Sequence, residues 1–150
     1  PIVQYRNLAQ MFPYTDELFR IKVTGKQLKH MIEYLYREDA LDGCHTEFYQ
    51  YSRGFEIYFD YENQVLEKLV LNGEEVTDEK LYNVGITSFH FENIKEFLDV
   101  SLEEISKNKE PKVVATKSAD VLEEYFSKQE LCKVAPDRRL CLKQYINVKN

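Results

Sequence analysis

The spacing of apolar side chains changes within residues 17–37. From Glu17 to Val23 (ELFRIKV), hydrophobic and polar residues alternate, which predicts a β-strand with one face in water. The spacing then becomes that of an amphipathic helix, i, i+3, i+4, i+7, carried by Leu28, Met31, Ile32 and Leu35. Thr24 and Gln27 stand where a capping box would begin this helix, so residues 25–37 are predicted to be helical.

Period-two runs and turn residues predict further strands along the chain. We expect strands over residues 48–52, 55–61, 64–71, 80–89 and 138–148. The segment 80–89 (KLYNVGITSF) is apolar nearly throughout, which favours a central strand. Asn72-Gly73 predicts a tight turn after the third run, because both residues tolerate positive φ.

The remaining segments have helical spacing. Short helices are expected over residues 4–12 and 92–98 and after Ser101, where Glu104 completes a second capping box. Residues 118–129 predict a second main helix, whose inward side chains would be Val121, Leu122, Tyr125 and Phe126. The sum is an α+β fold, in which a mixed or antiparallel sheet is covered by two main helices.

Length and charge narrow the class of protein. The 150 residues fit a single domain, and no run of eighteen apolar residues predicts insertion into a membrane. The net charge is −6, and the Lys and Arg residues form no stripe, which argues against a nucleic-acid partner and against an anionic membrane surface. Pro1 is not a natural initiator, so we expect a fragment or a processed product whose targeting signal could be missing.

Residues with catalytic potential are scattered. The five glycines are isolated and form no phosphate-binding loop. The three histidines, His30, His45 and His90, have no metal-site spacing and are interpreted as surface or packing residues. Of the three cysteines, Cys132 and Cys141 could form a disulfide with Cys44 left free, and three reduced thiols fit equally well. On these grounds the chain by itself is not expected to be catalytic.

The order of the segments carries a resemblance. NLAQMFPYTDELFRIKVTGKQLKHMIE contains the landmarks Pro13-Tyr14, Thr24-Gly25, Leu28 and Glu33, and is followed by FYQYSRG, LVLNGEEV, YNVGITSF, DVLEEYF and RRL. In this order they resemble the C-terminal, substrate-binding domain of the 5′-nucleotidase family. The similarity spans most of residues 5–89 and, more weakly, residues 115–142.

The resemblance implies a nucleotide site. In the family, an aromatic ring after the proline and another that closes the later strand stack on opposite faces of a nucleoside base, which assigns these roles to Tyr14 and Phe89. The alternative is that both rings pack in the core. The family's Gly-Gly-Asp-Gly, whose Asp contacts the ribose, is replaced by HFENIKEF, with Lys95 at the aligned position. Glu92 or Asn93 could substitute for that Asp.

The resemblance also implies that catalysis occurs elsewhere. In the family, an N-terminal metallophosphatase domain holds two divalent metal ions and hydrolyses the phosphate ester. Residues 1–150 are accordingly expected to be one C-terminal-like domain, truncated at its N-terminal edge before the family's phosphate-binding Asn-Gly-Gly-x-Arg loop. The expected partners are a nucleotide or nucleoside and the chain's own N-terminal domain, with no metal or other cofactor in this segment.

The resemblance leaves a second function open. The family is mostly secreted, periplasmic or attached to the cell surface, whereas the residues themselves indicate no compartment. Because the ribose motif is lost, the alternative function is a degenerate, non-catalytic interaction module of the same fold. Finding the Asn-Gly-Gly-x-Arg loop upstream of residue 1 would favour the enzyme over this module.

Overall fold

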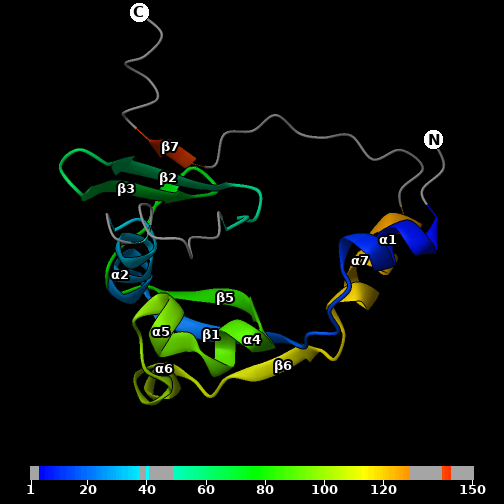
Figure 1. Cartoon of the computed structure of the whole chain (residues 1–150). Helices are drawn as coiled ribbons and strands as arrows, with labels where there is room; N and C mark the ends of the chain where they lie inside the picture. Colours follow the sequence, from blue (N-terminus) through cyan, green and yellow to red (C-terminus); the bar gives the residue numbers. More distant parts are fainter. Residues whose placement is uncertain (1–3, 38–39, 41–48, 129–139, 143–150) are drawn as a thin grey trace, which may run out of the picture.

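Seven strands form two separate sheets in the computed structural model, which describes residues 4–37, 40, 49–128 and 140–142 (Figure 1). The first sheet is antiparallel and has the order β5-β1-β6, built from β1 (Leu18–Thr24), β5 (Leu81–Thr87) and β6 (Lys112–Ala115). The second has the order β4-β3-β2-β7, built from β2 (Phe55–Asp60), β3 (Val65–Leu71), β4 (Glu74–Glu75) and β7 (Leu140–Leu142). Its β2 and β7 are parallel, whereas its other pairs are antiparallel.

The core lies between the two sheets, around helix α2 (Gly25–Leu35). The predicted capping box begins this helix: Gln27 N–H donates to Thr24 Oγ1 at 3.2 Å, and Thr24 N–H donates to Gln27 Oε1 at 2.9 Å. The stripe residues Leu28, Met31 and Ile32 are buried, and α2 contacts β1, β3 and β5. Burying each such side chain contributes about 1.5–3 kcal/mol. Because α2 contacts strands of both sheets, this burial holds the two sheets together.

Three short helices follow β5. They are α4 (Ser88–Glu92), α5 (Ile94–Leu98) and α6 (Leu102–Asn108). The Ser101–Glu104 capping box begins α6 as predicted, and α6 packs on β1 with Ile105 fully buried. The tight turn is also confirmed, since Asn72 and Gly73 both have positive φ between β3 and β4.

The position of β5 differs from the sequence prediction. It is an edge strand of the first sheet, whereas β1 is central. The apolar residues Tyr82, Val84 and Ile86 face the core from alternate positions, and the intervening Asn83 and Gly85 are exposed. The strand therefore alternates between buried and exposed side chains, although its composition is apolar nearly throughout. The strand also ends at Thr87, so that Phe89 lies on α4 rather than on a strand.

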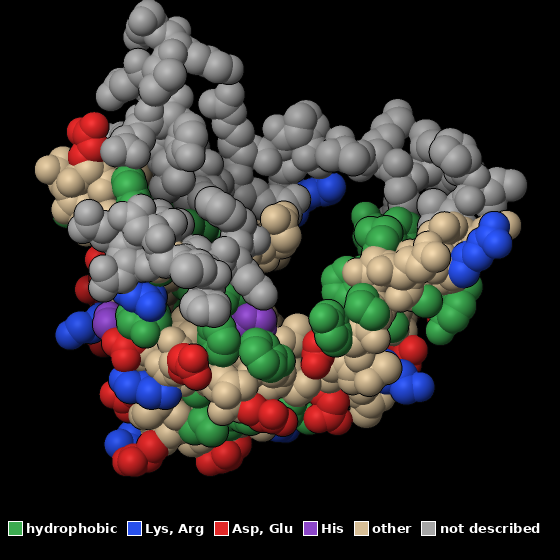
Figure 2. Space-filling model, viewed as in Figure 1, with side chains coloured by type: hydrophobic (Ala, Val, Ile, Leu, Met, Phe, Trp, Pro, Cys, Tyr) green, Lys and Arg blue, Asp and Glu red, His purple; other side chains and the backbone are tan. Residues whose placement is uncertain are grey.

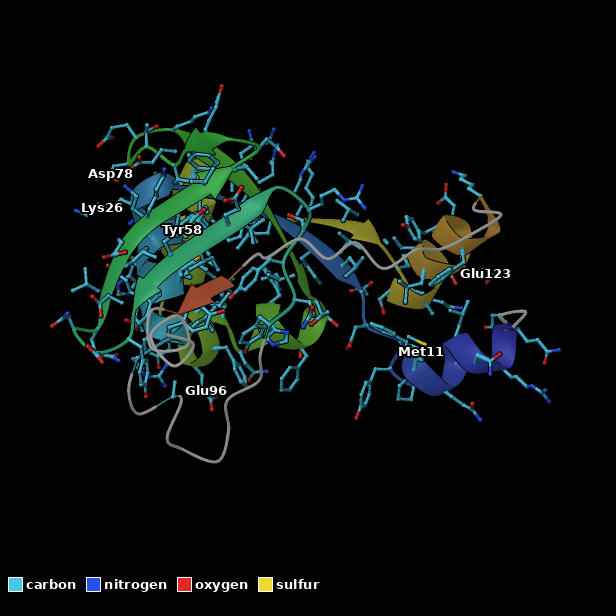
Figure 3. The ribbon with its side chains drawn as sticks, turned by 90° about the horizontal axis from the view of Figure 1, so that it is seen from above. Met11, Lys26, Tyr58, Asp78, Glu96 and Glu123 are labelled. Atoms are coloured by element: carbon cyan, nitrogen blue, oxygen red, sulfur yellow. The ribbon has the colours of Figure 1, made fainter. Side chains whose placement is uncertain are left out.

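Two helices lie apart from the sheets. Helices α1 (Tyr5–Met11) and α7 (Ser118–Ser127) contact each other, and we call this pair the helical arm. Figure 3 shows Met11 on α1 and Glu123 on α7 well away from Tyr58 on the second sheet. No residue of α1 is buried and only Ser118 of α7 is. The prediction that Val121 and Tyr125 point inward is wrong, because they are 42% and 52% exposed.

The α+β class, with antiparallel and mixed strand pairing, is confirmed. Residues 49–52, predicted as part of a strand, form none. Residue 48, most of the predicted strand 138–148, and the thiol pairing of Cys44, Cys132 and Cys141 lie outside what the structure describes. In the described part of the chain, no helix has the length and apolar character needed to cross a bilayer.

Candidate functional site

The candidate site lies where strands β1 and β5 end together. The two strands are antiparallel, and Leu18, the first residue of β1, pairs with Thr87, the last residue of β5. Tyr14 lies on the segment that leads into β1, and Phe89 lies on the helix that follows β5. The antiparallel register therefore brings the segments that carry the two predicted stacking residues to the same end of one strand pair.

Hydrogen bonds extend this contact beyond the strands. Ser88 N–H donates to Glu17 C=O at 2.8 Å, and the Ser88 hydroxyl donates to Asp16 Oδ1 at 3.3 Å. Asp16 C=O in turn accepts from Ser118 N–H, at the start of α7, at 2.8 Å. The segments that lead into β1, α4 and α7 thus meet at one point, two residues after Tyr14.

Both predicted stacking rings are exposed. Tyr14 is 71% exposed and Phe89 is 50% exposed, so neither ring belongs to the hydrophobic core. Figure 2 shows hydrophobic side chains on either side of the hollow that separates the helical arm from the sheets. Both rings are therefore accessible to solvent at this end of the β1–β5 pair.

Neighbouring rings support Phe89 from within the protein. Its ring centroid lies 5.3 Å from that of Phe97 and 5.4 Å from that of His90, which it meets edge-on. His90 also meets Tyr49 and Phe97 edge-on, and its Nδ1 lies 2.9 Å from Thr87 Oγ1. His90 is thus a packing residue, as the sequence indicated. A ring that is backed by other rings and still half exposed can serve as a stacking platform.

Two of the three expected ribose contacts lie beside this platform, at the junction of α4 and α5. The side-chain amide of Asn93 donates from Nδ2 to Phe89 C=O at 2.8 Å, which ends α4. Glu92 is exposed. Asn93 thus contacts the backbone of Phe89, and Glu92 is the last residue of the same helix. Their contact with a ribose stays a prediction.

Lys95, the third expected ribose contact, is bound to another residue of the α5 region. Its Nζ donates to Asp99 Oδ1 at 2.5 Å, and Asp99 Oδ2 lies 2.9 Å from His30 Nε2 on α2. The hydrogen bond from Lys95, and after it the one from His30, hold the pKa of the Asp99 carboxyl below its ordinary value. Lys95 therefore takes part in a surface charge cluster that joins α5 to α2.

A cavity of about 470 Å³ reaches the same end of the strand pair. Its walls come mainly from α2, from β5 and from residues 49–55, and it extends to Leu18, Thr87 and His90. Thr87 and His90 flank the Ser88–Phe89 pair in the sequence, so the cavity ends next to the platform. No pattern along the chain indicated this cavity, because residues 49–52 were expected to form a strand there.

The described residues provide no cluster of metal ligands. Among them, no three His, Cys, Asp or Glu side chains come together in an arrangement that could hold a metal ion. The features that these residues do provide are two exposed rings, a cavity and hydrogen-bonding groups at the junctions of helices.

Comparison with known protein families gives one match. The profile of the family described as “5′-nucleotidase, C-terminal domain” matches residues 2–100, which is more than half of the chain. A comparison with the sequences of curated proteins finds no match.

Solved structures share the fold at low sequence identity. NAD nucleotidase from Haemophilus influenzae aligns with a TM-score of 0.70 and 17% identity, over 93% of this chain and 26% of that one. A 5′-nucleotidase precursor from Thermus thermophilus aligns with a TM-score of 0.73 and 14% identity, over 93% of this chain and 28% of that one. A sulfate thiohydrolase from the same organism aligns with a TM-score of 0.54 and 17% identity, over 89% of this chain and 23% of that one. The chain thus spans about a quarter of the length of these structures.

Proposed function

Because this chain belongs to the 5′-nucleotidase C-terminal domain family, we propose that it recognises the nucleoside part of a nucleotide for a 5′-nucleotidase-like phosphohydrolase. Tyr14 and Phe89 stack on the base. The observation that carries this proposal is that both rings are exposed on segments that meet at one end of the β1–β5 pair. Stacking of a base on an aromatic side chain contributes about 1–3 kcal/mol and tolerates different bases.

The ribose would be bound at the junction of α4 and α5. Of the three candidates, Glu92 supplies a carboxylate like that of the family's Asp, whereas Asn93 is bound to the end of α4 and Lys95 to Asp99. A carboxylate accepts hydrogen bonds from sugar hydroxyls. Glu92 is therefore the first residue to test for this role.

Hydrolysis of the phosphate ester would take place in a further domain of the same polypeptide. This chain covers about a quarter of the length of each of the three solved structures named above, and two of those three are described as nucleotidases. In the proposed protein, an N-terminal domain would hold two divalent metal ions, which would supply the chemistry that activates water for attack. The residues of this chain bind and orient the nucleoside.

Binding to the chain itself tests the recognition step. We expect adenosine and AMP to shift the NMR signals of Tyr14 and Phe89 on titration. Tyr14→Ala should weaken binding at least ~5-fold, since ~1 kcal/mol of stacking corresponds to that factor, whereas Tyr14→Phe should retain most of it. Tyr5→Ala is the matched control, because Tyr5 is similarly exposed, at 68%, but lies at the far end of α1. Equal losses for Tyr14→Ala and Tyr5→Ala would contradict the stacking role.

Activity of the longer polypeptide tests the hydrolytic step. With added divalent metal it should release phosphate from nucleotides, and Tyr14→Ala should mainly raise KM, because the ring binds substrate away from the reacting phosphorus. No phosphate release from any nucleotide would remove the hydrolase proposal.

One observation favours the second candidate, a degenerate interaction module. Lys95 stands at the position aligned with the ribose-binding Asp, and its ammonium group is engaged by Asp99. A module of this kind would show no thermal shift with adenosine or AMP. A family phosphate-binding loop upstream of this chain, together with nucleotide binding by the longer polypeptide, would rule it out.

A further inference from the structure

We propose that Asp16 is a positioning residue, which fixes the segment carrying Tyr14 against the helix carrying Phe89 and so sets the separation of the two rings. This inference rests on the proposed function for its consequence in binding. Its structural part, the coupling of the two segments through Asp16, stands on the contacts of the protein alone.

Asp16 is the residue at which the three segments are joined. Its carbonyl oxygen accepts from Ser118 N–H at 2.8 Å, and its carboxylate accepts from the Ser88 hydroxyl at 3.3 Å. Ser118 is buried, so the first of these bonds is shielded from water. The second joins Asp16 to the residue directly before Phe89. Asp16 thus holds α7 through its backbone and the first residue of α4 through its side chain.

The backbone hydrogen bond from Ser88 to Glu17, taken alone, leaves the orientation of α4 less constrained than two bonds would. Ser88 N–H binds Glu17 C=O at 2.8 Å and continues the β1–β5 ladder by one step. The side-chain bond from Ser88 to Asp16 adds a second attachment, one residue further from the strands. Two attachments on successive residues restrict rotation of the first turn of α4, and Phe89 is the second residue of that helix.

The separation of the rings matters because stacking has a short range. A flat base held between two rings needs about 7 Å between them, twice the contact distance of ~3.5 Å between carbon atoms. Gaps of about 0.5–1 Å already remove roughly a quarter to a half of the dispersion attraction. A residue that fixes this separation can thus affect binding without contacting the ligand.

Substitutions at Asp16 separate positioning from direct contact. Asp16→Asn keeps an acceptor oxygen for the Ser88 hydroxyl, whereas Asp16→Ala removes it. We expect Asp16→Ala to weaken adenosine binding about 5-fold, the factor for one hydrogen bond worth ~1 kcal/mol, and Asp16→Asn to weaken it less than about 2-fold. Glu17→Ala is the matched control, since it removes the same charge one residue later and leaves the Glu17 carbonyl in place.

The partner residue provides the reciprocal test. Ser88→Ala removes the same hydrogen bond from the other side and should reproduce the Asp16→Ala effect. The double variant Asp16→Ala/Ser88→Ala should bind no more weakly than either single variant, because one bond can be lost only once. Additive losses would overturn the inference, as would an Asp16→Asn variant as weak as Asp16→Ala, which would indicate that the carboxylate contacts the ligand itself.

Hydrogen exchange tests the coupling without any ligand. In the Asp16→Ala variant, the Ser88 amide should exchange up to about 5-fold faster than in the wild type, because the side-chain bond that holds Ser88 is lost. The Ser118 amide, whose acceptor is the Asp16 backbone carbonyl, should be unchanged, and in Glu17→Ala both amides should be unchanged. If adenosine does not bind to the wild type while exchange responds as expected, the proposed function fails and the coupling stands. If exchange of the Ser88 amide is unaffected by Asp16→Ala, the inference is overturned whatever the binding shows.

Discussion

The core around α2 and the helical arm differ in how they are stabilised. In the core, Ile21, Val23, Ile57, Phe59 and Leu69 are almost completely buried between two sheets. In the arm, α1 buries no residue, and among the large apolar side chains Tyr5, Met11, Val121 and Tyr125 are exposed. Helices of 7 and 10 residues are too short to be stable in isolation, so the arm depends on its attachment to the rest of the fold.

Because the core and the arm differ in this way, the residues that stabilise the fold are not the residues of the candidate binding site. Tyr14 follows the arm and precedes β1, so its ring contributes little to the core and remains available to a ligand. Phe89 lies on the other side of the junction and is supported by Phe97 and His90. Substitutions in the core should therefore lower the free energy of unfolding, whereas substitutions in the arm should leave it nearly unchanged.

The largest contrast is expected between two aromatic truncations. Phe59→Ala removes a ring that is 1% exposed and packs against Tyr36, so we expect the free energy of unfolding to fall by about 3–5 kcal/mol. Tyr125→Ala removes an exposed ring of the arm and should lower it by no more than ~0.5 kcal/mol. Urea denaturation monitored by circular dichroism measures both, and a loss above about 2 kcal/mol for Tyr125→Ala would show that the arm stabilises the core.

The next contrast concerns two glycines of the core region. A Cβ at Gly25, the first residue of α2, would lie 2.0 Å from the carbonyl oxygen of Thr77, so Gly25→Ala must displace backbone. We expect a loss of about 1–3 kcal/mol. Gly85 on β5 has open space and no positive φ, and Gly85→Ala should be neutral or stabilise by up to ~1 kcal/mol. Thermal midpoints of the two variants decide this, and equal midpoints would contradict the close packing of α2 on the Thr77 segment.

A smaller contrast is expected between two helix N-termini. Thr24→Ala removes the hydroxyl that caps α2 and should cost about 1 kcal/mol. Asn7→Ala removes the oxygen that accepts from Gln4 N–H at 2.9 Å at the start of α1, and should cost no more than ~0.3 kcal/mol, because unfolding of α1 exposes no core. The free energies from denaturant titrations test this order, and the reverse order would contradict the division into core and arm.

Local signals in the sequence predicted the elements whose determinants are close in the chain. The Thr24–Gln27 capping box, the stripe of α2 and the Asn72-Gly73 turn each depend on residues within one or two helical turns, and all three are confirmed. The failures have long-range causes. The apolar character of 81–87 could not show that β1 would take the central place, because strand order depends on β6. The amphipathic pattern of 118–127 could not show that α7 would pack on α1.

The candidate site divides in the same way. The exposure of Tyr14 was predictable from its place after Pro13, since that proline ends a helix. The placement of Phe89 on a helix was missed, because nothing in the run 80–89 indicated that the strand ends at Thr87. The Asp16, Ser88 and Ser118 contacts join three segments that are far apart in the chain, and no pattern within any one of them indicates the others.

The smallest expected effect is a difference between two surface ion pairs in how the thermal midpoint depends on pH. Asp99 joins α5 to α2 through Lys95 and His30, and these bonds hold its pKa below the ordinary value. An unfolded Asp titrates at ~3.9, so this stabilisation is complete above about pH 5 and is lost as the pH falls through the lower pKa of the folded state.

Asp99→Asn should therefore lower the thermal midpoint slightly at about pH 6 and not at all at the acid end of the titration. Asn is the appropriate replacement, because Asp99 has a φ of 50° and Asn tolerates this left-handed conformation. Glu124→Gln, which removes the carboxylate paired with Lys128 on α7, is the matched control in the arm and should leave the midpoint unchanged at every pH. Midpoints measured from about pH 2 to about pH 6 decide the comparison. A difference between Asp99→Asn and the wild type that persists at the acid end would show that the residue acts through packing rather than through its charge.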